Sequence, residues 1–356
     1  MSTQSERIGR LRAAMNDGDL DALLVSGSAS VRWLTGYGGS NGLALVTQSR
    51  AVLFTDFRYA DSVEPLRQEL DVEVVDQNLV GAITPRLAQL AGGAVGFESN
   101  QLTHAAWSLL GASGAELRPT SMLLENLRAV KSPAEVELLR RASHASDQIY
   151  ARIADAGLAG RTERAVAHQI GDWCRELGDD ASFSAVVAAA ENGGRPHAVA
   201  RDVEIPRGTL VVIDLGVRID GYHGDCTRTF ATGSTEAEHK EVYEVVLSAQ
   251  QAAKGLIRAG AGCADVHEAA KRVIGDAGYG EFFKHGTGHG VGVEIHEEPR
   301  FRDGLGGTLQ VGNAVTVEPG IYLPGRFGVR IEDLVVVDAD GYETLTGFPT
   351  SLLDVG

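Results

Sequence analysis

The pair Asp220-Gly221 constrains the fold most strongly, because it lies between two apolar runs in the segment TLVVIDLGVRIDGYHGDCTRTF, residues 209–230. An Asp-Gly pair in such a setting is typical of a two-residue β-hairpin turn. With that turn, Asp214 faces Thr227, and Asp214 and Asp225 become diagonal neighbours on one face of the hairpin. Their Cα atoms would then lie about 7–8 Å apart. A turn longer by one residue would separate the two faces.

Asp214 and Asp225 are predicted to point at one spot in an apolar setting. Burying two unpaired carboxylates costs several kcal/mol, and the two groups also repel each other. A cation between them would remove this conflict. The alternative is that Asp214 is a buried acid bonded to backbone amides and that Asp225 belongs to a turn.

A second hairpin is predicted in AVTVEPGIYLPGRFGVRIEDLVVV, residues 314–337. Glu318 ends the first apolar strand, and Glu332 is expected inside the second. Arg330 precedes Glu332 by two residues, so both side chains share a face. Two interpretations follow: Glu332 forms an ion pair with Arg330, or Glu332 is a metal ligand and Arg330 orients it or the substrate.

The segment HGTGHGVGVEIHE, residues 285–297, contains three histidines among regularly spaced glycines. Each glycine would weaken a helix by roughly 1 kcal/mol, so we expect a loop that runs into a strand. In an extended chain His285 and His289 share a face, whereas His296 points away unless the strand bends. The segment by itself does not decide which histidine is a ligand.

These three segments together supply two aspartates, two glutamates and a histidine between glycines. Structural zinc prefers cysteine and histidine, whereas an oxygen-rich set with one nitrogen suits a pair of manganese, cobalt, iron or zinc ions. The sequence therefore predicts paired metals that serve hydrolysis.

The length of 356 residues predicts two domains, since single cores stop growing near roughly 250 to 300 residues. Helical and strand-like segments alternate in the first third, which indicates an α/β domain. Ser132, Pro133 and Glu135 then form a helix-start pattern. We predict an N-terminal α/β domain over residues 1–126 and an α+β domain over residues 127–356, with helices covering a curved sheet.

The net charge of -16 argues against a nucleic-acid or anionic-membrane partner, because both require a basic face. A small molecule or a peptide is the expected substrate. The three cysteines show no paired metal-type spacing, and Cys226 is expected to be an inert thiol that points away from the metals. No signal core and no 18-residue uncharged run is present. We expect a cytoplasmic protein.

The motifs IDLGVRIDGYHGDCTRTF, HGTGHGVGVEIHE, VEPGIY and GVRIED occur in this order. Together they resemble the M24 pita-bread metallopeptidases, which include aminopeptidase P, prolidase and, more distantly, methionine aminopeptidase and creatinase. The N-terminal segments WLTGYGGSNGLALVT and LFTDFRYAD are similar to the creatinase and aminopeptidase P N-terminal domain. The resemblance therefore covers the whole chain and implies a pita-bread catalytic domain behind a creatinase-like domain.

The resemblance implies two divalent ions, with manganese expected first and cobalt, zinc or iron as alternatives. The implied ligands are Asp214 on the first metal, Asp225 and Glu332 bridging both, and His289 and Glu318 on the second. Glu318 would also take and return the proton of the attacking water, and Thr227 would support the bridging aspartate. The implied residues on the substrate side are His197, His285, His296 and Arg330, and His296 is expected to stabilise the oxyanion.

The implied reaction is hydrolysis of the peptide bond before proline. TGYGGSNG and TDFRY are more similar to aminopeptidase P, which releases the N-terminal residue from longer Xaa-Pro peptides. The alternative is prolidase, which is restricted to dipeptides and normally captures their free carboxylate with a cationic group; the sequence does not identify that group. A non-catalytic peptide-binding module is a more remote alternative. The resemblance also implies a homodimer.

Overall fold

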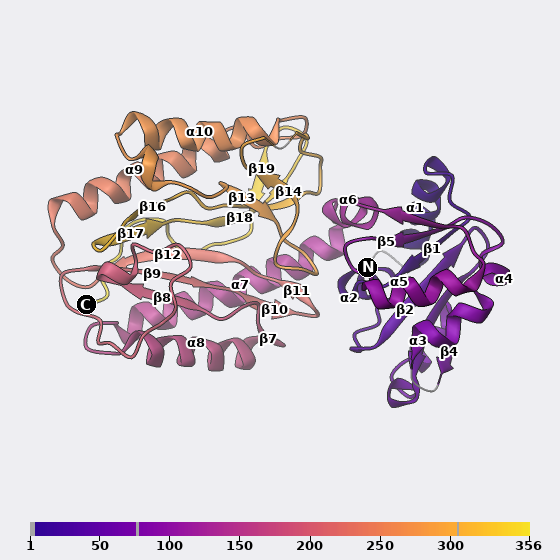
Figure 1. Ribbon diagram of the computed structural model, residues 1–356. Coiled ribbons are helices and arrows are strands. Elements are labelled where there is room, and N and C mark those ends of the chain that lie inside the picture. Colours follow the sequence, from indigo (N-terminus) through magenta and orange to yellow (C-terminus); the bar gives the residue numbers. More distant parts are fainter. Residues whose placement is uncertain (1–3, 76–77, 305) are drawn as a thin grey trace. The chain divides into compact units, whose positions relative to one another are not determined.

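The computed structural model describes residues 4–75, 78–304 and 306–356. Its internal contacts divide the chain into two compact units, Met1–Arg128 and Ala129–Gly356. Each unit has its own sheets and helices (Figure 1). Among the described residues no helix combines the length and the apolar character needed to cross a bilayer.

The first unit is built on one six-stranded sheet in the order β4-β3-β2-β1-β5-β6. β1 pairs antiparallel with β2 and parallel with β5, so the sheet is mixed. Its strands are β1 (Ala22–Val25), β2 (Gly42–Thr47), β3 (Ala51–Asp56), β4 (Asp71–Val75), β5 (Val95–Glu98) and β6 (Leu117–Thr120). Its helices are α1 (Gln4–Asp17), α2 (Ser28–Thr35), α3 (Leu79–Ile83), α4 (Leu87–Ala91), α5 (His104–Leu110) and α6 (Leu123–Ala129). The alternation of helix and strand confirms the predicted α/β character of this region.

Four long helices belong to the second unit: α7 (Pro133–Ala156), α8 (Glu163–Leu177), α9 (Ala237–Lys254) and α10 (Cys263–Asp276). The predicted start of α7 is confirmed, because Ser132 and Glu135 form a reciprocal capping box with Pro133 in the first turn. Within this unit α9 and α10 lie on one side of the strands, and α7 and α8 lie on the other (Figure 1). Apolar side chains fill a core on each side.

The strands of the second unit form a three-stranded sheet β12-β9-β8, a small sheet β11-β10-β7, a five-stranded sheet β14-β13-β15-β18-β19 and a two-stranded sheet β16-β17. The strands before α9 are β7 (Asp180–Ala181), β8 (Val186–Ala189), β9 (Leu210–Leu215), β10 (Val217–Ile219), β11 (Tyr222–His223) and β12 (Cys226–Ala231). Those after α10 are β13 (Gly288–Gly290), β14 (Glu297–Phe301), β15 (Ala314–Val317), β16 (Gly320–Leu323), β17 (Phe327–Arg330), β18 (Asp333–Val337) and β19 (Tyr342–Thr344). Short 3-10 turns connect several elements: η1 (Phe57–Tyr59), η2 (Glu64–Gln68), η3 (Thr84–Arg86), η4 (Gly111–Ser113), η5 (Ala190–Asn192) and η6 (Gly280–Phe282).

The first predicted hairpin has the predicted register. Thr227 pairs with Asp214, and Arg218 pairs with His223. The turn residues Asp220 and Gly221 have φ angles of 50° and 78°, as a tight two-residue turn with two left-handed positions requires. The register places the side chains of Asp214 and Asp225 on one face, as expected.

The second predicted hairpin is only partly right, because Glu332 does not lie inside a strand. It lies between β17 and β18, and Glu318 likewise lies between β15 and β16. At these two breaks the chain passes from the five-stranded sheet to the two-stranded sheet and back. The amide of Glu332 therefore leaves the hairpin and donates to the carbonyl of Thr227 on β12.

Candidate active site

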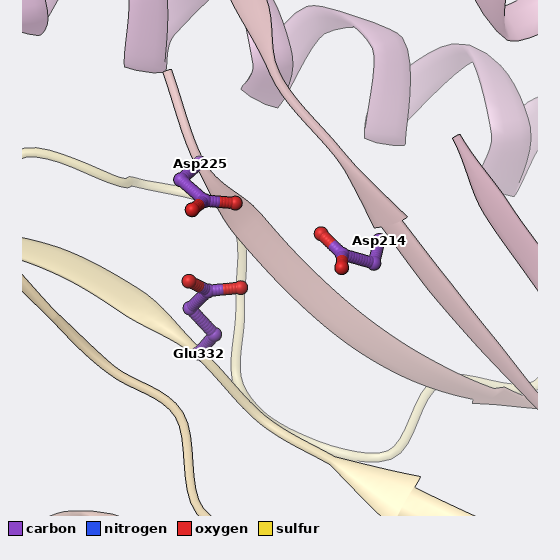
Figure 2. Close-up of side chains that lie close together, drawn as sticks. All are labelled: Asp214, Asp225 and Glu332. Atoms are coloured by element: carbon purple, nitrogen blue, oxygen red, sulfur yellow. The ribbon is translucent and has the colours of Figure 1, made fainter. Parts of the chain in front are cut away.

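Three carboxylates converge where the hairpin β9–β12 meets the break between β17 and β18. Asp214, Asp225 and Glu332 each offer one carboxylate oxygen, and these oxygens all lie within 4.8 Å of one another. Figure 2 shows the three carboxyl groups pointing toward a common space. Asp225 and Glu332 are 5% and 1% exposed. Such a group of oxygens in a buried position is the donor set that a divalent cation prefers.

The electrostatics of this cluster are unfavourable without a cation. Burial and the neighbouring carboxylates raise the pKa of Asp225 and of Glu332 well above the ordinary range. Burial also raises the pKa of Asp214, although the Arg330 guanidinium opposes this. Asp214 Oδ1 and Glu332 Oε1 are buried and accept no hydrogen bond from the described residues. Asp214 is thus not satisfied by backbone amides, and the residues fit a metal site.

His289 and Glu318 extend the cluster on one side. His289 Nε2 lies 3.3 Å from Glu318 Oε1 and 3.6 Å from Asp225 Oδ2. Its Nδ1 atom lies 3.0 Å from the carbonyl oxygen of Gly290, which fixes the ring with Nε2 toward the carboxylates. Burial would raise the pKa of Glu318, but its hydrogen bond with His289 and the charge of that ring lower the pKa to about 2.

Arg330 connects the converging carboxylates to the rest of the cavity. Its Nη2 donates to Asp214 Oδ2 at 2.7 Å, and its Nε donates to Thr227 Oγ1 at 2.9 Å. Its ion pair is with Asp214 rather than with Glu332, the partner that the sequence suggested. Thr227 was expected to support Asp225, but its hydroxyl donates to Glu332 Oε2 at 2.7 Å. Residues two apart in a strand lie almost 7 Å apart, whereas the main chain of Glu332 bonds directly to Thr227.

Tyr322 on β16 is a site residue that sequence reasoning missed. Its hydroxyl accepts a hydrogen bond from Arg330 Nη1 at 2.9 Å and lies 3.0 Å from His285 Nε2. A tyrosine in an apolar strand reads as a core residue, and this one is indeed buried. The available indication was its place four residues after Glu318 in VEPGIY.

The carboxylates open into a cavity of about 450 Å³ that is lined by all the residues predicted as metal ligands or as residues on the substrate side. Those lining residues are His197, Asp214, Asp225, His285, His289, His296, Glu318, Arg330 and Glu332. His296 was expected to point away from His285 and His289 unless the chain bends. The pairing of β13 with β14 shifts in register after His289, and with this bend His296 also lines the cavity. Burial lowers the pKa of His285 and of His296, which keeps both imidazoles neutral at pH 7.

Arg300 and Arg302 also line the cavity, and sequence reasoning did not select them. Arg300 is half-buried on β14, and its Nε lies 3.2 Å from Glu298 Oε1. Arg302 follows directly after the same strand. Their spacing of two residues, which puts both side chains on one face, was the available indication.

The glycines of the HGTGHG segment allow neighbouring main chains to approach closely. A Cβ atom on Gly288 would lie 1.9 Å from the carbonyl oxygen of Thr316, and one on Gly290 would lie 2.1 Å from that of Glu298. Only glycine fits at such distances. The close approach also brings Thr316 Oγ1 to the amide of His289, which donates to it at 3.0 Å.

Two parts of the chain match known protein families. Residues 137–339 match the model of metallopeptidase family M24, and residues 7–130 match the creatinase/prolidase N-terminal domain. The chain is 34% identical to the uncharacterized peptidase YqhT of Bacillus subtilis, over 98% of this chain and 99% of that protein. It is 30% identical to a Xaa-Pro dipeptidase of Pyrococcus horikoshii, over 97% and 98% of the two chains.

Solved structures agree in fold. A Xaa-Pro dipeptidase from Bacillus anthracis is similar with a TM-score of 0.95 and 34% identity, covering 99% of both chains. An X-Pro aminopeptidase from Thermotoga maritima is similar with a TM-score of 0.89 and 30% identity, covering 98% of this chain and all of that one. The similarity therefore extends over both compact units.

Proposed function

The chain belongs to metallopeptidase family M24 and carries its creatinase/prolidase N-terminal domain, and from this premise we propose that it hydrolyses the peptide bond before proline. The predicted pita-bread fold behind a creatinase-like domain is confirmed, and the protein is a metallopeptidase. The observation that carries the proposal is the convergence of Asp214, Asp225 and Glu332 beside His289 and Glu318 in one cavity.

The proposed ligands are the five residues that the sequence selected. These residues would hold two divalent ions: Asp214 would serve one ion, His289 and Glu318 would serve the other, and Asp225 and Glu332 would be ligands common to the pair. Manganese is the first choice and cobalt, zinc or iron are alternatives. Bound divalent ions supply a lowered pKa for the attacking water and polarise the scissile carbonyl.

The remaining chemistry belongs to side chains of this chain. Glu318 is ionised at neutral pH, so it can take the proton of the attacking water and return it to the leaving nitrogen. His296 stabilises charge on the carbonyl oxygen, and His285 and His197 line the region of the proline ring. Arg330 holds Asp214 in place, while Tyr322 holds Arg330 and His285.

The two arginines of the cavity favour a dipeptide substrate. The carboxylate of an Xaa-Pro dipeptide lies one residue beyond the scissile bond and calls for a cation, and a guanidinium matches a carboxylate with two parallel hydrogen bonds. Arg300 and Arg302 supply such groups, although the sequence alone favoured aminopeptidase P. The Xaa-Pro dipeptidases of Pyrococcus horikoshii and Bacillus anthracis support the dipeptide, whereas the Thermotoga maritima aminopeptidase supports longer peptides.

The test compares Ala-Pro, Ala-Pro-amide and Ala-Pro-Ala with metal-stripped protein before and after addition of Mn²⁺. We expect metal-dependent cleavage with Ala-Pro as the preferred substrate. Faster cleavage of Ala-Pro-Ala would instead identify an aminopeptidase P, and no cleavage with any divalent ion would favour the binding module.

The Arg300→Ala variant tests the role of the guanidinium. We expect KM for Ala-Pro to rise about 10-fold, because a charged hydrogen bond is worth roughly 1.5–3 kcal/mol, with little change for Ala-Pro-amide. The control is Arg272→Ala on the exposed face of α10. An equal loss for both substrates would exclude carboxylate capture by Arg300.

The homodimer and the cytoplasmic location stay predictions. Light scattering of the purified protein tests the first, because a mass near twice 37.6 kDa identifies a dimer. Fractionation of the producing cells tests the second.

A further inference from the structure

His197 reaches the cavity from a surface loop, residues 190–201, that contains no regular structure after η5. The loop follows β8 and returns to the first turn of α8, where the amide of Arg164 donates to the carbonyl of Arg201. His197 itself is exposed. Something else must therefore fix the loop if this histidine is to hold one position.

We infer that Glu163, at the start of α8, is a positioning residue that closes this loop and thereby places His197 at the cavity. The inference rests on the proposed function, in which His197 contacts the substrate. Glu163 does not line the cavity, so it would act only through the loop.

The carboxylate of Glu163 binds both ends of the loop. Its Oε1 accepts hydrogen bonds from the amide of Ala189 at 2.9 Å and from Arg201 Nη2 at 3.0 Å. Its Oε2 accepts from Asn192 Nδ2 at 2.9 Å, from the amide of Arg201 at 2.8 Å and from Arg201 Nε at 3.1 Å. One side chain, 1% exposed, thus joins residues 189, 192 and 201.

Further contacts transmit this closure to the tip of the loop. Asn192 Nδ2 also donates to the carbonyl of Val199 at 3.1 Å, which bridges the loop from within. A Cβ atom on Gly194 would lie 2.4 Å from the carbonyl oxygen of Leu323, so the loop packs tightly on the β16–β17 hairpin. The carbonyl of Pro196, next to His197, accepts from Arg330 Nη1 at 3.3 Å.

A role in the helix alone does not account for these contacts. A carboxylate in the first turn of a helix is stabilised by the helix dipole, and Glu163 has that position in α8. All five of its hydrogen bonds, however, come from outside the helix. Every partner is a donor, so an amide in place of the carboxylate would turn its own NH₂ group toward donors and leave buried groups unsatisfied.

The experiment compares Glu163→Gln, His197→Ala and the double variant, with Glu135→Gln as a matched control. Glu135 is 2% exposed, caps α7 and does not line the cavity. We expect Glu163→Gln to reduce kcat/KM for Ala-Pro by about 10- to 100-fold with unchanged Mn²⁺ stoichiometry. In the His197→Ala background, Glu163→Gln should reduce kcat/KM by less than about 2-fold, because both variants remove the same interaction between His197 and the substrate. Glu135→Gln should keep kcat/KM.

Amide hydrogen exchange supplies a readout that does not depend on activity. Glu163→Gln should accelerate exchange in residues 190–201 and leave residues 209–231 unchanged. If this variant does not fold, Arg201→Gln takes its place, because it changes a partly exposed side chain that donates two of the five hydrogen bonds.

Unchanged exchange in the loop, or the same loss of kcat/KM with and without His197, would overturn the inference. If the unmodified protein cleaves no Xaa-Pro substrate, the proposed function fails, and the exchange measurement still decides whether Glu163 closes the loop.

Discussion

The hydroxyl of Tyr322 connects Arg330 and His285, because it accepts a hydrogen bond from Arg330 and contacts the His285 ring. We predict that Tyr322→Phe lowers kcat/KM for Ala-Pro by about 10- to 100-fold. A hydrogen bond to a charged group contributes roughly 1.5–3 kcal/mol, and its loss frees both partners to move. Steady-state kinetics and metal analysis check this, since the bound Mn²⁺ should not change.

The matched control for this variant is Tyr243→Phe on α9. The Tyr243 hydroxyl donates to the carbonyl of Thr350 and does not line the cavity. The Tyr243→Phe variant should lower the free energy of unfolding by about 1 kcal/mol and leave kcat/KM unchanged. Full activity of Tyr322→Phe, or an equal loss in Tyr243→Phe, would contradict the assigned role.

Much of the site could be predicted from the sequence because of the types of residue involved. Carboxylates in apolar strands are costly unless they have a function, so Asp214 and Glu332 stood out. Tyr322 and Arg300 did not, because a tyrosine in an apolar strand is typical of a core and an arginine is typical of a surface. Their roles depend on contacts that only the packed structure shows.

The elements of the site depend on close main-chain contacts, and Gly288 on β13 is the sharpest example. We predict that Gly288→Ala lowers the free energy of unfolding by about 1–3 kcal/mol, because its Cβ would lie 1.9 Å from the carbonyl oxygen of Thr316. The alanine side chain should push Thr316 on β15 away, and this should also displace His289, whose amide donates a hydrogen bond to Thr316 Oγ1. Urea unfolding measures the first effect and Mn²⁺ affinity the second.

Gly275→Ala on α10 is the comparison for Gly288→Ala. A Cβ atom on Gly275 would meet no other atom within 4 Å, and Gly275 belongs to a helix, so alanine should stabilise the protein by up to about 1 kcal/mol. If Gly288→Ala were as stable as Gly275→Ala, the close approach of β13 and β15 would be wrong.

The register of one hairpin could be predicted and the path of the other could not. Asp220-Gly221 sets the turn, and the turn sets every pair along β9–β12. In residues 314–337 the apolar pattern continues through the points where the chain changes sheets. A run of apolar residues indicates burial but not which strand lies alongside, so the breaks at Glu318 and Glu332 stayed hidden.

The stability of the whole molecule should depend on metal and on pH together. Without metal, the raised pKa values of Asp225 and Glu332 mean that the folded state holds these protons more tightly than the unfolded chain. This contribution is full below the ordinary carboxyl pKa, about 4, and is lost as pH rises through the raised values. The lowered pKa of Glu318 gives its contribution to stability the opposite pH dependence. That contribution is lost only below about pH 4.5, as pH falls toward the pKa of about 2.

We therefore predict that Mn²⁺ raises the melting temperature of metal-stripped protein more at pH 8 than at pH 5.5. Deprotonated ligands bind the ion, and the ion removes their repulsion. Thermal unfolding at both pH values measures the difference. Glu332→Gln should reduce it, and an equal gain at both pH values would show that the carboxylate cluster does not bind the ion.

At the scale of the whole chain, the resemblance of four motifs and two N-terminal segments was enough to predict both domains, which the family matches confirm. The identity of the metal was not predictable, because the same oxygen and nitrogen donors accept several divalent ions. Substrate length was not predictable either, since it depends on which cations reach the cavity wall.

Titration of metal-stripped protein with Mn²⁺, while Ala-Pro hydrolysis is followed, tests directly whether the chain is a two-metal Xaa-Pro peptidase. We predict no hydrolysis without metal and a rate that reaches its plateau at two ions per chain. Hydrolysis by the stripped protein, or none with Mn²⁺, Co²⁺, Zn²⁺ or Fe²⁺, would contradict a two-metal Xaa-Pro peptidase.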